Sequence, residues 1–99
     1  DAGEKVNATD RTRIEKFILA QLKMGRFVLT VHARERMNKR FISELDIVEI
    51  AKTLKSIKRQ KVNDTYLLSG LSTWRGKLKV SVAVRGEVII VTVFYEELP

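Results

Sequence analysis

Residues 77–95, with the sequence KLKVSVAVRGEVIIVTVFY, contain the strongest pattern of the chain and decide its predicted fold. In residues 77–84, apolar and polar side chains alternate with a period of two, which is typical of a strand with one buried face. Residues 87–95 form a second, mostly apolar run, and Arg85 and Gly86 between the two runs suit a tight turn. We therefore predict a β-hairpin with a two-residue turn.

The turn fixes which residues of the two strands are opposite each other. A two-residue turn gives the pairs Val84 with Glu87, Ser81 with Ile90, Lys79 with Thr92, and Lys77 with Phe94. The polar face then consists of Lys77, Lys79, Ser81 and Thr92, and the core face carries Val80, Val82, Val91 and Tyr95. The polar face could hold a phosphate backbone, although an ordinary solvent-exposed face would show the same pattern. Twist at the strand end could still free the Tyr95 hydroxyl.

Shorter extended segments precede the hairpin. Residues 26–31 suit a short strand, and residues 57–62 and 65–69 suit a strand pair around Asn63-Asp64. Helical patterns occupy most of the N-terminal half, and strands follow them. The expected fold is therefore α+β: a single domain, residues 1–99, with N-terminal helices packed on a twisted, largely antiparallel four- to five-stranded sheet.

Three helices are predicted before the strands. Residues 9–23 form the first, with Thr9 or Asp10 as N-cap and Gly25 as C-cap, and residues 32–39 form the second. The third begins at a capping box, Ser43-Glu44-Leu45-Asp46, flanked by the hydrophobic staple Ile42 and Ile47. The apolar stripes of the first two helices are Ile14, Phe17, Ile18 and Leu22, and Ala33, Met37 and Phe41.

Composition narrows the functional classes. Nineteen Lys and Arg against 12 Asp and Glu give a formal net charge of +7 over 99 residues, which favours a polyanionic partner, although such charge also keeps small domains in solution. The chain has no cysteine and one histidine, so a nucleophilic cysteine is excluded and neither a metal centre nor another cofactor is expected. No apolar run is long enough to span a membrane.

The single histidine heads a cationic ridge. His32, Arg36 and Arg40 are spaced four and four residues apart, so on a helix they span only about 80° of its circumference, whereas Arg34 projects elsewhere. Imidazole transfers protons near neutral pH, and guanidinium binds phosphate in a bidentate manner. RNA cleavage by 2′-hydroxyl attack needs both functions. The alternative is a solvated helix face with an ordinary surface histidine.

Trp74 and Arg75 join two predicted strands and could supply a base-stacking ring beside a phosphate-binding guanidinium. A tryptophan in such a connection can equally well cover the core. On the first interpretation, Trp74 and Arg75 join Lys77, Lys79 and Tyr95 as candidate substrate-binding residues.

Residues 31–43, VHARERMNKRFIS, resemble the HARxRMxxRgIs signature of a bacterial family of RelE-like toxins within the barnase, EndoU, colicin and RelE ribonuclease group. Segments 79–82 and 91–93 resemble the closing hairpin of that family. The resemblance implies a ribonuclease with His32, Arg36, Arg40 and Thr92 in the catalytic site. Phe41 stands where glycine is common in the signature, which affects the expected end of the helix.

The resemblance also implies partners and a site of action. Family members occur as stand-alone toxins with antitoxins and as C-terminal toxin domains of contact-dependent inhibition proteins, so an acidic antitoxin or immunity protein is expected. We expect action in the bacterial cytoplasm, with delivery from a secreted or cell-surface precursor as one route, and transfer RNA as the first-choice substrate. The alternatives are a non-catalytic nucleic-acid-binding module and a basic protein-interaction domain.

Overall fold

A five-stranded sheet with the order β1-β5-β4-β3-β2 organises the protein, and three helices pack on it. The computed structural model describes residues 2–61, 63–72 and 76–96, with side chains from residue 12 onward except that of residue 72. The elements are α1 (Ala2–Lys23), β1 (Val28–Leu29), α2 (Val31–Arg40), α3 (Glu44–Lys52), β2 (Ser56–Gln60), β3 (Thr65–Ser72), β4 (Gly76–Val84) and β5 (Val88–Tyr95). β1 runs parallel to β5, and every other pair is antiparallel, which confirms the α+β prediction.

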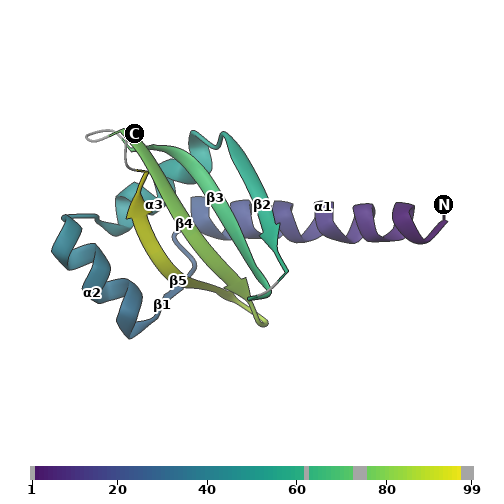
Figure 1. Ribbon diagram of the computed structural model, residues 1–99, viewed down its shortest axis with the longest axis horizontal. Helices are drawn as coiled ribbons and strands as arrows, with labels where there is room; N and C mark the ends of the chain where they lie inside the picture. The colour runs from purple at the N-terminus through teal and green to yellow at the C-terminus, as the bar shows by residue number, and fades with distance from the viewer. Residues whose placement is uncertain (1, 62, 73–75, 97–99) are drawn as a thin grey trace.

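The helices leave one face of the sheet open. Figure 1 shows α1 and α3 behind the sheet and α2 beside β5, whereas no helix of the described residues crosses the face turned to the viewer. The core between helices and sheet includes Ile18, Leu22, Ile47, Ile50, Leu68, Val80, Val82, Ile90 and Val93, all fully buried. The opposite face, which we call the open face, carries the alternate side chains of the strands.

The first helix is longer than predicted. It begins at Ala2 rather than near Thr9, because residues 2–8 include good helix formers and no proline, so Thr9 and Asp10 are not at its start. The predicted end is confirmed: Gly25 has φ 72°, and the N–H groups of Gly25 and Arg26 donate to the carbonyls of Leu22 and Gln21.

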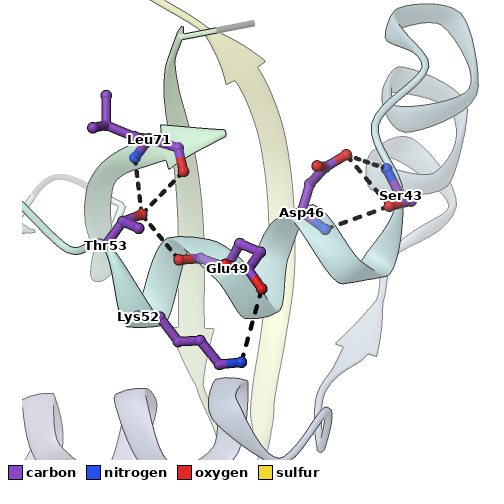
Figure 2. Close-up of polar contacts among 6 residues, drawn as sticks. All are labelled: Ser43, Asp46, Glu49, Lys52, Thr53 and Leu71. Atoms are coloured by element: carbon purple, nitrogen blue, oxygen red, sulfur yellow. Dashed lines mark hydrogen bonds and ion pairs between the residues drawn. The ribbon is translucent and has the colours of Figure 1, made fainter. Parts of the chain in front are cut away.

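The third helix begins as predicted (Figure 2). The Ser43 hydroxyl accepts a hydrogen bond from the Asp46 N–H (3.4 Å), and the Asp46 carboxylate accepts one from the Ser43 N–H (2.9 Å). Ile42 and Ile47 are both buried beside this capping box. The box fixes the chain direction between α2 and α3.

The end of α3 is tied to β3 (Figure 2). The Thr53 hydroxyl accepts a hydrogen bond from the Leu71 N–H (3.0 Å) and lies within hydrogen-bond distance of the Leu71 and Glu49 carbonyls. Gly70 allows the close contact, since a Cβ there would lie 3.1 Å from the Ile50 carbonyl oxygen. These contacts place residues 55–56 beside β3 at the start of β2.

The predicted hairpin is present, but the predicted register of its two strands is wrong in two places. Val84 pairs with Val88, so the turn has three residues instead of two. A bulge follows, because Val82 pairs with Ile90 whereas Ser81 pairs with Thr92, which leaves Val91 without an opposite residue. Each change moves the register by one residue, so together they return Thr92 to the predicted polar face. Val91 does not join Val80 and Val82 in the buried core.

Phe41 does not join the apolar stripe of α2. Ala33 and Met37 are buried, whereas Phe41 is 78% exposed and lies at the C-cap with φ 55°. Phe41 therefore adopts the left-handed backbone conformation that favours glycine, the residue common at this position of the signature. The helix still includes Arg40, so the predicted ridge is on one continuous helix.

Candidate active site

Helix α2 is attached at both ends to the exposed edge of β5. β1 pairs only with Ile89 and Ile90, so the rest of that edge needs other partners. At the start of α2, the Thr30 hydroxyl donates to the Val91 carbonyl (3.3 Å) while accepting from the Ala33 N–H (3.0 Å). At its end, Arg40 Nη1 donates to the Val93 carbonyl (2.8 Å). These side chains hold α2 along β5.

This attachment brings the predicted ridge to the last strand. A hollow of about 480 Å³ lies between α2 and β5, and its lining residues are His32, Arg36, Arg40, Thr92, Phe94, Tyr95 and Glu96. All four predicted catalytic residues line this α2–β5 hollow. Ala33 and Met37 bury the other side of the helix, so the ridge is directed away from the core.

The lining includes two guanidinium groups, one imidazole and one carboxylate. His32 and Arg36 are exposed, and Arg40 is half-buried because its guanidinium reaches over the β5 edge. Arg34 lines a different hollow with Leu29 and Asn38, which confirms that it projects away from the ridge.

Glu96 is the residue that sequence reasoning missed. It is the only acidic residue among the described ones lining the hollow, and it forms ion pairs with Lys77 (3.7 Å) and Lys79 (3.5 Å). The Glu96 N–H also donates to the Lys77 carbonyl, so the ladder of β4 and β5 continues by one pair. With the correct register, the opposite charges of Lys77 and Glu96 would have predicted this pairing.

The predicted substrate-binding residues are divided between neighbouring places. Lys77 and Lys79 line a second hollow on the open face, which shares Glu96 with the α2–β5 hollow. Tyr95 pairs with Leu78 and packs against the core, as its position in the strand predicts, yet it also lines the α2–β5 hollow. Trp74 and Arg75 lie outside the described residues.

A third hollow of about 480 Å³ lies on the open face, next to the α2–β5 hollow. Thr92 and Phe94 line both hollows. Its polar lining includes Gln60, Thr65 and Ser81, and the Thr65 hydroxyl donates to the Gln60 amide oxygen (3.1 Å). Phe94 therefore lies at the border of two hollows.

Comparison with known proteins assigns the chain to a family. Residues 29–95 match the family described as "Domain of unknown function (DUF4258)". The chain belongs to this family. The match to DUF4258 begins at the end of β1 and ends with β5, so it includes every residue lining the α2–β5 hollow except Glu96. No curated protein and no solved structure matches the chain significantly.

The DUF4258 site combines a proton-transfer group with fixed positive charge. Neutral imidazole can accept a proton and its protonated form can donate one, and the guanidinium groups can neutralise a phosphate, while Thr92 and Tyr95 add hydroxyl donors. In the described part of the chain, no cluster of three His, Asp or Glu residues could hold a metal ion. No helix there is both long and apolar enough to cross a membrane.

Proposed function

We propose that this DUF4258 protein is a metal-independent endoribonuclease toxin that cleaves RNA by attack of a ribose 2′-hydroxyl on the adjacent phosphate. The observation that supports it best is the presence of His32, Arg36, Arg40 and Thr92 in a single hollow formed by two elements. Transesterification of RNA needs proton transfer and charge neutralisation at one phosphate, and this set of groups supplies both.

The reaction divides into steps that these side chains can serve. The 2′-oxygen forms a bond to phosphorus and loses its proton, the bond from phosphorus to the 5′-oxygen breaks, and the leaving oxygen takes up a proton. The products are a 2′,3′-cyclic phosphate and a free 5′-hydroxyl. His32 serves as general acid or base, while Arg36 and Arg40 neutralise the extra negative charge of the transition state. Thr92 donates to a non-bridging oxygen, and Lys79 assists from the neighbouring hollow.

The net charge of +7 supports an RNA substrate, with transfer RNA as the first choice, and an acidic antitoxin or immunity protein as inhibitor. The proposed place of action is the bacterial cytoplasm, reached directly or from a secreted or cell-surface precursor. A non-catalytic RNA- or DNA-binding module and a basic protein-interaction domain would have the same charge. Neither alternative requires an imidazole beside two guanidinium groups.

The test is incubation of the purified protein with total RNA and with transfer RNA in the presence of a chelator. We expect discrete fragments ending in 2′,3′-cyclic phosphate from the natural protein and none from the His32→Ala variant. Arg34→Ala is the matched control, because Arg34 lies on the same helix but lines another hollow, and it should cleave normally. The proposal is wrong if the natural protein does not cleave, or if His32→Ala cleaves equally well.

A further inference from the structure

Of the four lysines that line the second hollow, on the open face, only Lys79 has a part in the proposed chemistry. This hollow measures about 480 Å³, and Lys55, Lys58, Lys77 and Lys79 line it around the apolar side chain of Leu67. The four lysines come from the α3–β2 connection, from β2 and from β4, so three separate segments converge on the same place. We call it the lysine hollow.

The charges of the lysine hollow are only partly compensated. Glu96 is its one acidic lining residue among the described ones, and it pairs with Lys77 and Lys79. Lys55 and Lys58 form no ion pair within the described part of the chain. Like charges brought together without counter-ions attract an anionic ligand, and lysine binds phosphate as a flexible point charge.

The strand register connects the lysine hollow to the α2–β5 hollow. Lys58 pairs with Leu67, Leu67 with Ser81, and Ser81 with Thr92, so these four residues form a row across the open face. The row crosses three strand spacings, which places Lys58 about 14 Å from Thr92. Glu96 lines both hollows, so they adjoin directly.

We infer that the lysine hollow is a second phosphate-binding site, which holds the backbone of a single-stranded RNA a few nucleotides away from the phosphate that is cut. This inference rests on the proposed function for the identity of the ligand. It predicts that affinity depends on oligonucleotide length, because a dinucleotide in the α2–β5 hollow cannot reach Lys55 and Lys58. Lysine contacts to phosphate carry no sequence information, so the site strengthens binding to any RNA sequence.

The test compares the natural protein with Lys55→Gln/Lys58→Gln, which removes both charges and keeps much of the side-chain length. The control Lys16→Gln/Lys23→Gln removes the same charge from exposed positions of α1, behind the sheet. The probe is a fluorescent 12-nucleotide 2′-O-methyl RNA, which lacks the attacking hydroxyl, so binding is measured independently of cleavage. Affinity is measured by fluorescence anisotropy over a range of salt concentrations.

Two lost phosphate contacts should lower the slope of log affinity against log salt by about 1.4, since each contact to a single strand contributes about 0.7. At 0.1 M salt this corresponds to a loss of affinity of about 25-fold in Lys55→Gln/Lys58→Gln, with a much smaller loss in the control. Cleavage of a dinucleotide should stay at the natural rate. Probe binding without any RNA cleavage would overturn the proposed function and leave the lysine hollow as a nucleic-acid site.

Equal salt slopes for the natural protein and Lys55→Gln/Lys58→Gln would overturn the inference. It would also be overturned if the natural protein failed to bind the probe but bound poly-glutamate through Lys55 and Lys58, because the hollow would then belong to an acidic protein partner. A circular dichroism spectrum and a thermal unfolding curve check that both double variants are folded.

Discussion

The Arg40 guanidinium donates a hydrogen bond from Nη1 to the Val93 carbonyl over 2.8 Å while it also lines the α2–β5 hollow. This bond uses one of the five N–H donors of arginine, so the others remain for a ligand. It also holds the guanidinium at Val93, the residue that follows Thr92 on β5. Arg40 therefore has two roles, since it holds the end of α2 and supplies positive charge at the site.

The Arg40→Lys variant tests whether Arg40 acts through its planar guanidinium or only through its positive charge. Lysine keeps the positive charge but lacks the planar fork that can bind Val93 and phosphate together, so we expect RNA cleavage to fall by about 100-fold. The free energy of unfolding should fall by about 1 kcal/mol, as for loss of a partly buried hydrogen bond. Single-turnover cleavage and urea unfolding measure the two effects. Arg34→Lys is the control, and natural cleavage by Arg40→Lys would show that positive charge alone suffices at this position.

Thr30 holds the other end of α2, and its replacement tests whether the helix must be attached to work. Thr30→Val removes both the N-cap bond to Ala33 and the bond to the Val91 carbonyl, and should lower the free energy of unfolding by about 1–2 kcal/mol. Cleavage should fall as well, because His32 lies in the first turn of the released end. Thr30→Ser keeps the hydroxyl and should restore both properties; failure of this rescue would refute the attachment as the cause.

The hairpin shows how far sequence could predict the site. Alternation identified the strands and the polar face, because burial of one face enforces a period of two. It could not identify the bulge at Val91, because residues 88–91 are all apolar and fit either face. Together with the three-residue turn, the bulge concealed Glu96, because the predicted register pairs its partner Lys77 with Phe94.

The α2 ridge was predictable for a different reason. Spacing of four residues places side chains on one face of any helix, so His32, Arg36 and Arg40 needed no tertiary information. Their position beside Thr92 did need it, because the bonds of Thr30 and Arg40 to β5 carbonyls join segments more than 50 residues apart. Such contacts leave no periodic pattern in the sequence.

Phe41 offers a test of backbone strain. Its φ of 55° is in the left-handed region, which costs a non-glycine residue about 1–2 kcal/mol, and its side chain is 78% exposed. We expect Phe41→Gly to raise the free energy of unfolding by about 1 kcal/mol, measured by urea unfolding. Phe41→Ala loses the ring but keeps the strain, so it should give no such gain. Equal stability of the glycine and alanine variants would show that strain at this position is not what limits stability.

Glu96 lies between the two hollows, and its removal should affect binding and cleavage differently. The carboxylate holds Lys77 and Lys79, so an RNA phosphate entering the lysine hollow must compete with it. Glu96→Gln leaves both ammonium groups free, and we expect tighter binding of the 2′-O-methyl RNA, with the salt slope steeper by about 0.7 for each additional phosphate contact. Glu87→Gln, at the exposed hairpin turn, changes the net charge equally and should leave the slope unchanged.

Two outcomes of the Glu96 experiment bear on its role. If Glu96→Gln binds RNA no more tightly than Glu87→Gln, the carboxylate does not compete with RNA. If binding tightens but single-turnover cleavage falls, Glu96 takes part in the reaction as well, consistent with its position in the same hollow as His32.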